Sequence, residues 1–214
     1  MTCSSSPSNI KDALVLDTSV LINLHACRYG EQILAAIPND IVVTQIVAGE
    51  LEHETSRRNG EHNFLKSLVA SRVVTLTELT DEEFETFFEL TSSVPVLDDG
   101  EAATIAVAAA RGCFPIIDEK RGRGRASALL SECQSGWSLE LFRHPATLAT
   151  LGDDVARDAL FLALRDGRMR IPVMSIEDVI ALIGEERARA CTCLPGYRLR
   201  FCEQIEVGIR ADVA

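Results

Sequence analysis

Short apolar runs that alternate with longer stretches of helical periodicity constrain the fold of this chain more than any other feature. Four of these runs are rich in β-branched residues and only four or five residues long: ALVL at 13–16, DIVV at 40–43, RVVTL at 72–76 and FPII at 114–117. Such runs predict short buried strands. Strands that alternate with helices pair in parallel, because the connecting helices cover both faces of the sheet. We therefore predict an α/β fold with a central parallel sheet.

Helices are predicted between and after these strands. Apolar residues recur at broadly helical spacing after each of the first three strands, over 20–37, 46–54 and 81–93. Beyond FPII, the segment 136–142 is a candidate edge strand. After it the pattern becomes helical only, with helices predicted near 153–165 and 175–189.

This change of pattern near residue 145 predicts the domain organisation. We expect a disordered start over 1–11, a sheet domain over 12–144 and a helical extension over 145–214. No long Gly/Ser linker separates the last two parts, so we expect the extension to pack on the core of the sheet domain.

Composition argues against several classes of protein. In 214 residues, 47% of them hydrophobic, no apolar run approaches the ~20 residues that span a bilayer. The start MTCSSSPSN lacks the features of a signal peptide, so we expect a cytoplasmic protein with no membrane partner. The net charge of −11 disfavours an extended nucleic-acid platform but leaves room for a local basic patch. The seven scattered cysteines favour reduced thiols, and CTC at 191–193 lacks a nearby histidine that would complete a zinc site.

Four acidic residues fall where the predicted strands end or the next helices begin. Asp17 ends the first strand and Glu50 lies early in the helix after the second. Glu101 opens the helix GEAATIAVAAA, and Asp118 ends the strand FPII. The carboxyl ends of parallel strands meet at one edge, where open α/β sheets place their sites. Because clustered carboxylates repel one another unless a cation neutralises them, the pattern predicts a Mg²⁺ or Mn²⁺ site.

Each acid also has a purely structural explanation. Asp17 and Asp118 stand at positions typical of helix N-caps. Glu101 follows Asp98 at the spacing of a capping box, and Glu50 is one of several acids in its helix. Taken singly, these explanations compete well with the metal site. Capping does not require acids at the same sheet edge in four separate units, so we favour the metal site.

The four motifs LVLDTSVLINL, VTQIVAGELEHE, LDDGEAATIAVAAARG and PIIDEKRGRGRA occur in this order. Together they resemble the PIN-domain family of metal-dependent nucleases, over roughly residues 12–142. The third motif is similar to that of a predicted nucleic-acid-binding branch, related to the toxin halves of bacterial toxin–antitoxin pairs. The resemblance implies a three-layer α/β/α sandwich and an acidic Mg²⁺ or Mn²⁺ pocket that cuts single-stranded RNA. By analogy alone it also raises a toxin role, with an antitoxin protein as partner.

The resemblance assigns catalytic roles residue by residue. Asp17 matches the first acid of the family, Glu50 the second and Glu101 the third, where many relatives carry Asp. The fourth acid is open between Asp118 and Glu119, because the hydroxyl residue that often begins this motif is Ile117 here. The metal ligands implied are therefore the first three acids and Asp118, with Glu119 as the alternative to Asp118.

Neighbouring residues are candidates for substrate binding. Thr18 and Ser19 match polar positions after the first acid, where their hydroxyls can hold a carboxylate or a bound water, or simply begin a helix. The segment EKRGRGR concentrates positive charge beside the acids and can hold the RNA backbone, or compensate the nearby acids. Its basic residues are Lys120, Arg121, Arg123 and Arg125.

Two other functions remain open from the sequence. The first is a PIN-like module that binds RNA or a protein without cutting. The second is a phosphotransferase or phosphatase with Asp17 as nucleophile. Enzymes of the haloacid-dehalogenase kind place a second Asp two residues later, where Ser19 stands here, so we rank this function third. Three roles are open for the helical extension: covering the pocket, forming a homodimer, or receiving a partner.

Overall fold

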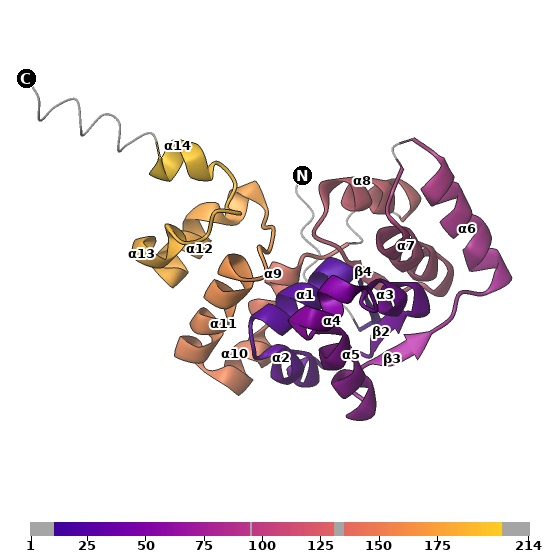
Figure 1. Ribbon diagram of the computed structural model, residues 1–214, viewed down its shortest axis with the longest axis horizontal. Coiled ribbons are helices and arrows are strands. Elements are labelled where there is room, and N and C mark those ends of the chain that lie inside the picture. Colours follow the sequence, from indigo (N-terminus) through magenta and orange to yellow (C-terminus); the bar gives the residue numbers. More distant parts are fainter. Residues whose placement is uncertain (1–10, 95, 131–134, 203–214) are drawn as a thin grey trace, which may run out of the picture.

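A four-stranded parallel sheet lies at the centre of the structure, a computed structural model that describes residues 11–94, 96–130 and 135–202 (Figure 1). The strand order is β3-β2-β1-β4, with all neighbours parallel. The strands are β1 (Leu14–Leu16), β2 (Ile41–Thr44), β3 (Thr75–Thr77) and β4 (Phe114–Ile116). All four predicted strands are thus present, and the predicted parallel sheet is confirmed. The expected disordered start lies outside the described residues except for Lys11.

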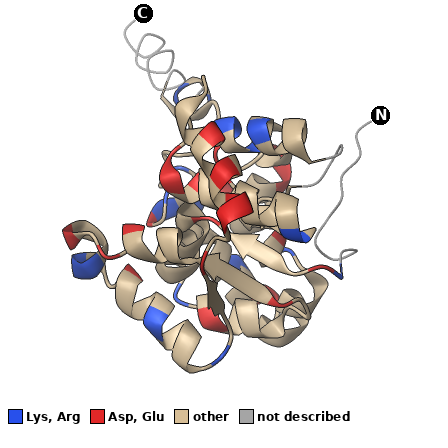
Figure 2. Ribbon diagram, turned by 90° about the vertical axis from the view of Figure 1, so that its right-hand side faces the viewer, with Lys and Arg blue, Asp and Glu red and all other residues tan. Residues whose placement is uncertain are grey.

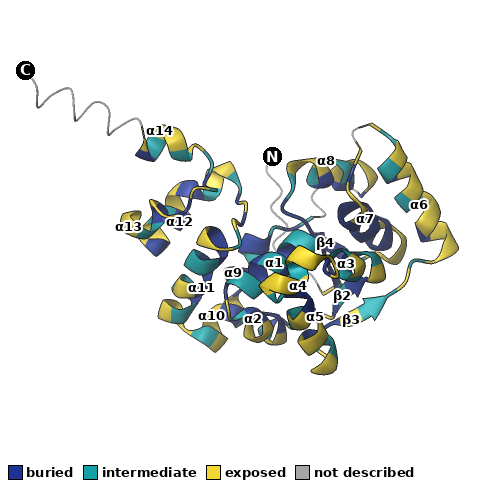
Figure 3. Cartoon of the chain, in the orientation of Figure 1, coloured by how far each residue is buried: buried dark blue, intermediate teal, exposed yellow. Residues whose placement is uncertain are grey.

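Helices cover both faces of the sheet, which gives the three-layer α/β/α sandwich (Figure 1). One layer holds α6 (Asp81–Ser92), α7 (Asp99–Arg111) and α8 (Lys120–Leu129), and α7 contacts β1, β2 and β4. The other layer holds α1 (Thr18–Ala26), α2 (Gly30–Ala36) and α5 (Glu61–Ala70). Figure 3 shows that the buried residues concentrate in the strands and on the helix faces toward them.

Two hydrophobic clusters correspond to the two sides of the sheet. Leu14 and Leu16 of β1 pack in one cluster with Leu21 and Leu24 of α1. The second cluster lies around α7 and includes Ile105. Strand residues alternate between faces, so a short strand such as β1 contributes to both sides and is buried at every position.

Two predicted helices are each divided in the structure. The helix expected over 20–37 is interrupted between α1 and α2, where Arg28 adopts a left-handed backbone with φ of 68°. Gly30 begins α2 so close to α1 that a Cβ atom there would lie 2.4 Å from the carbonyl oxygen of Leu24. The helix expected over 175–189 is likewise broken at Gly184, which has a φ of 89°. It forms α12 (Ile176–Ile183) and α13 (Glu185–Ala188).

The predicted edge strand over 136–142 is wrong, because this segment forms helix α9 (Ser138–Phe142) after a single parallel bridge between Gly136 and Ile116. Side chains take the backbone donors that a strand would need. The N–H of Trp137 donates to the side chain of Glu140, and the N–H of Ser138 donates to the side chain of Asp118. Between β2 and α5, the segment after the second strand forms α3 (Gln45–Glu50) and α4 (Glu54–Asn59).

The C-terminal part consists of helices, two of which contact the helices of the sheet domain. They are α10 (Pro145–Leu151), α11 (Asp153–Arg165), the short 3₁₀ helix η2 (Val173–Ser175), α12, α13 and α14 (Tyr197–Phe201). α10 packs on α2 and α11 packs on α1. Leu160 and Leu164 of α11 belong to the same cluster as β1. No helix among the described residues is both long and apolar enough to span a membrane.

Candidate active site

The acids predicted from the sequence lie at the carboxyl edge of the sheet or at the starts of neighbouring helices. Asp17 follows β1, Glu50 ends α3, and Glu101 lies in the first turn of α7. Asp118 and Glu119 follow β4, the strand beside β1. Figure 2 shows acidic segments grouped above the strands in the middle of the view, with most basic segments around them.

Asp17 is both a helix cap and a buried acid. Its Oδ2 accepts hydrogen bonds from the hydroxyl of Ser19 at 2.6 Å and from the N–H of Ser19 at 3.3 Å, so it caps α1. Its own N–H donates to the carbonyl of Ile116, which ties the end of β1 to the end of β4. Burial, together with the charge of nearby Asp98, raises the pKa of Asp17 to about 7. Capping of α1 therefore explains the hydrogen bonds to Oδ2, but it does not explain why the carboxyl group is buried.

Glu101 is buried, and no residue that the structure describes forms a hydrogen bond of normal geometry with its Oε1 atom, although the backbone of Gly122 lies close enough to offset part of its pKa shift. Asp98 caps α7 by accepting from the N–H of Glu101 at 2.9 Å, but the reciprocal bond of a capping box is not formed. Burial raises the pKa of Glu101 to about 8, and the charges of Asp98, Asp17 and Glu119 add to the rise. The ionised carboxylate of Glu101 would therefore lie close to other negative charges. This arrangement is unfavourable unless a cation neutralises them.

Glu50 connects three helices at the same edge. Its Oε1 accepts from the N–H of Gly100 at 2.8 Å, and its Oε2 accepts from the hydroxyl of Thr18. Burial raises the pKa of Glu50, although these two donors offset part of the rise. Gly100 has to be glycine for this contact, because a Cβ atom there would lie 2.5 Å from Oε2 of Glu50.

Asp118 and Glu119 differ in their surroundings. The Oδ1 of Asp118 accepts from the N–H of Ser138 and its Oδ2 accepts from the side-chain amide of Asn23, both at 2.8 Å. Burial raises the pKa of Asp118 to about 6 in spite of these donors. Glu119 is partly exposed and forms an ion pair with Arg170 of the C-terminal part. Asp118 is therefore rigidly held, whereas Glu119 is free to exchange partners.

The basic segment divides into inward and outward residues. Arg123 is directed inward: its Nη1 donates to the carbonyl of Gly136 at 2.7 Å, and its guanidinium lies 4.2 Å from the ring centre of Trp137. Lys120 and Arg121 are exposed on α8, and Arg125 is partly buried. Thus Arg123 connects α8 to the segment before α9, while the exposed residues remain available to a ligand.

The donor chemistry fits a magnesium or manganese ion, although the ligands are not gathered. No group of three His, Cys, Asp or Glu side chains in the described ranges lies close enough to hold a metal. However, the donors are all carboxylate oxygens, and Oε1 of Glu101 is buried without a hydrogen-bond partner among the described residues. Burial and, after it, like charges raise the pKa of Glu101. The charge of Asp17 contributes to the raised pKa of Glu101, so Asp17 and Glu101 are the two residues that are favoured most directly as metal ligands.

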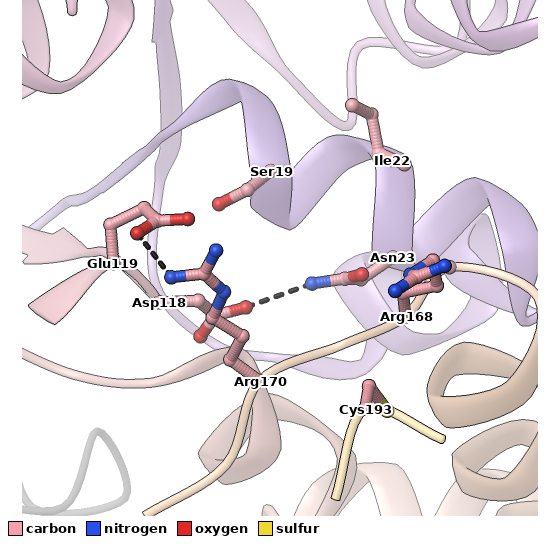
Figure 4. Close-up of a pocket in the computed structure, with 9 residues that line it drawn as sticks. Ser19, Ile22, Asn23, Asp118, Glu119, Arg168, Arg170 and Cys193 are labelled. Atoms are coloured by element: carbon pink, nitrogen blue, oxygen red, sulfur yellow. Dashed lines mark hydrogen bonds and ion pairs between the residues drawn. The ribbon is translucent and has the colours of Figure 1, made fainter. Parts of the chain in front are cut away.

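A cavity of about 420 Å³ lies beside two of these acids, Asp118 and Glu119. Ser19 and Asn23 of α1 line it together with Asp118 and Glu119, and Arg168 and Arg170 line it from the segment after α11 (Figure 4). Asn23, Ser138 and these two arginines were not predicted from the sequence. Asn23 carries a signal, because it is a lone amide in the apolar run VLINL. The arginines carry none, since their position depends on how α11 packs.

Comparison with known families supports the fold. A family model described as a PIN domain matches residues 13–134, which is more than half of the chain. Comparisons with curated proteins and with solved structures gave no match. The matched residues include all four strands and the five acids described above. The chain therefore belongs to the PIN-domain family.

Proposed function

We propose that this chain is a metal-dependent endoribonuclease that cuts single-stranded RNA with the help of Mg²⁺ or Mn²⁺. The observation that carries the proposal is the buried carboxyl group of Glu101, whose Oε1 has no hydrogen-bond partner in the described part of the chain and whose pKa is raised by burial and by neighbouring acids. Membership of the PIN-domain family supports a nuclease-like function at this site. A bound cation would offset the electrostatic cost of burying these acids together.

Each acid has its own role in the proposal. Asp17 and Glu101 hold the ion, and Asp118 is the fourth acid because it is buried and fixed by two donors. Glu50 lies further out and holds the start of α7 through Gly100. Glu119 is the alternative to Asp118, and the less active of the Asp118→Asn and Glu119→Gln variants identifies the residue that matters.

The chain contributes fixed geometry to the chemistry. A bound divalent ion lowers the pKa of water and offsets charge at the phosphate. In hydrolysis the water oxygen bonds to phosphorus, the bond from phosphorus to the 3′ oxygen breaks, and that oxygen takes a proton. Ser19 holds Asp17 and Thr18 holds Glu50 before the substrate arrives, so little reorganisation is needed during reaction.

The outward basic residues are proposed to bind RNA. Lys120 and Arg121 are exposed beside the acids, and Arg125 lies one turn further along α8. Arg123 has donors engaged with backbone carbonyls, so we give it a positioning role in addition to its charge. Phosphate contacts of this kind weaken with salt, which makes them measurable.

A cleavage assay tests the proposal. End-labelled single-stranded RNA is incubated with the chain in Mn²⁺, in Mg²⁺ and in EDTA, and fragments are resolved by size. We expect internal cleavage with either metal and none in EDTA. Asp17→Asn is expected to be folded and nearly inactive, while the exposed control Glu82→Gln keeps full activity. Cleavage in EDTA at the rate seen with metal would falsify the mechanism.

The second candidate is a PIN-domain protein that binds RNA or a protein without cutting. It is favoured by one observation: Glu50, Asp118 and Glu119 already have hydrogen-bond or ion-pair partners. A rise in melting temperature with Mn²⁺ in the absence of any cleavage would favour this candidate. A toxin role with an antitoxin, a homodimer and a cytoplasmic location stay predictions, and a small DNA-binding protein encoded next to the chain would support the first of these.

A further inference from the structure

The segment that follows α11 returns toward the acids and brings two arginines to the cavity. Arg168 and Arg170 flank Met169, which is 1% exposed and belongs to the main hydrophobic cluster. The N–H of Met169 donates to the carbonyl of Ala163 at 3.1 Å. Met169 thus anchors the segment, and both neighbouring arginines line the cavity (Figure 4).

The path of this segment is fixed beside α1. A Cβ atom on Gly167 would lie 2.8 Å from the carbonyl of Ala163 and 2.8 Å from Oδ1 of Asn23. Asn23 is the residue whose amide holds Asp118. The two arginines therefore have a defined position relative to the acid that we propose as a metal ligand.

The charges of the two arginines are available to an anion. Arg168 has no ion pair among the residues that the structure describes, and it is exposed. Arg170 pairs with Glu119, but the side chains are 59% and 35% exposed, and exposed ion pairs contribute little stability. Replacing this pair by a contact with phosphate therefore costs little. The planar guanidinium group binds phosphate with two parallel hydrogen bonds.

We propose that Arg168 and Arg170 bind a phosphate of a single-stranded RNA in this cavity, next to the phosphate at the acids. The identity of the ligand rests on the proposed function, whereas the position of the arginines does not. In a chain with a net charge of −11, such a site gives a polyanion a favourable approach to an acidic centre. It also gives the C-terminal part a role in substrate binding.

Fluorescence anisotropy tests this site without requiring cleavage. A short labelled single-stranded RNA is titrated with the chain in EDTA at several salt concentrations. The test variant is Arg168→Gln/Arg170→Gln. The control is Arg72→Gln/Arg198→Gln, which removes the same charge from exposed residues before β3 and on α14. Circular dichroism confirms that each variant is folded.

We expect the test variant to bind RNA about tenfold more weakly. The slope of its salt dependence should be lower by roughly 0.7, the contribution of one phosphate contact on a single strand. The control should match the unmodified chain. Arg170→Gln alone should show about half of the loss in slope, and it replaces the double variant if that variant does not fold.

The outcomes separate this inference from the proposed nuclease. Equal affinities and slopes for test and control variants overturn the phosphate site, even if the unmodified chain cuts RNA. A selective loss of binding in the test variant supports the site, even if no cleavage is ever detected. If the unmodified chain does not bind RNA at all, the inference is overturned.

Discussion

At the scale of single residues, the hydrogen bonding and burial of Glu101 distinguish a structural role from a functional one. In a capping box its carboxylate would accept a hydrogen bond from the N–H of Asp98, and the structure lacks this bond. Oε1 is buried without a hydrogen bond from any residue in the described ranges. A purely structural residue would not be placed at this electrostatic cost. The carboxylate is therefore better explained as a ligand than as a cap.

The first prediction concerns the charge of Glu101. At about pH 8 in EDTA, Glu101→Gln should be more stable than the unmodified chain by ~1 kcal/mol, or roughly 2–4 °C in melting temperature, because a repelled charge is removed. The same variant should lose the increase in melting temperature that Mn²⁺ gives to the unmodified chain. Differential scanning fluorimetry measures both effects.

Glu82→Gln is the matched control, since Glu82 is exposed on α6. It should behave like the unmodified chain with and without Mn²⁺. An unchanged melting temperature of the unmodified chain at saturating Mn²⁺ counts against the metal site.

Sequence alone pointed to the acids and to Thr18 and Ser19, which donate to Glu50 and Asp17, but not to the residues that hold Asp118. Asp17 and Glu101 are recognisable because strand ends and helix starts are visible in the hydrophobic pattern. Asn23 and Ser138 hold Asp118 across 95 and 20 residues of chain. Periodicity carries no information about such contacts, because they depend on tertiary packing.

At the scale of elements, the helix α8 shows how close the packing is around the acids. Gly122 lies against Glu101, and a Cβ atom there would be 2.7 Å from Oε1. Gly124 of the same helix has no atom within 4 Å of such a Cβ. The two glycines of the GRGR sequence therefore have different roles, which the sequence does not reveal.

The second prediction compares these two glycines. Gly124→Ala should stabilise the chain by about 0.5–1 kcal/mol, because alanine favours the helix. Gly122→Ala should destabilise it by roughly 1–3 kcal/mol and reduce RNA cleavage, because the methyl group displaces Glu101. Urea unfolding and the cleavage assay measure the two effects. Equal stability of the two variants would show that α8 does not pack on Glu101 in this way.

Element boundaries were predictable where local signals are strong. The helix expected over 81–93 matches α6 (Asp81–Ser92), which begins with a capping box of Thr80 and Glu83. The helix expected over 153–165 matches α11. By contrast, the break at Arg28 is a backbone conformation that periodicity does not show. The segment 136–142 is apolar enough for a strand but is made helical by contacts to its N–H groups.

At the scale of the whole molecule, the parallel sheet was predictable because alternating strands and helices permit few arrangements. Packing of the C-terminal part on the sheet domain was expected as well, but the contacts that it makes there were not predictable. Arg170 meets Glu119 across 51 residues of chain, and nothing in either local sequence indicates the pairing. The contact results from the packing of α11 on α1.

The third prediction is that stability without metal decreases as pH rises. The pKa values of Asp17, Glu101 and Asp118 are raised by burial to about 7, 8 and 6 from ordinary values of 3.8, 4.5 and 3.8. At pH values between the ordinary and the raised pKa of each group, the folded state binds more protons than the unfolded state. The free energy of unfolding therefore falls as pH rises through this range. Urea unfolding in EDTA at several values from about pH 5 to about pH 8 measures this loss.

A divalent metal ion should reduce the loss of stability at high pH, because it binds the ionised carboxylates. The difference between the unmodified chain and Glu101→Gln isolates the contribution of Glu101, since groups such as His144 contribute equally to both. A difference between these two chains that does not change with pH in EDTA contradicts the raised pKa of Glu101.

The measurement that tests the central claim most directly is the rate of cleavage of single-stranded RNA as Mn²⁺ is titrated into the EDTA-treated chain and into Glu101→Gln. Our account predicts a rate that rises from zero to saturation for the unmodified chain. It predicts almost no cleavage by the folded variant at any concentration. A rate that is independent of Mn²⁺, or a variant as active as the unmodified chain, contradicts the account.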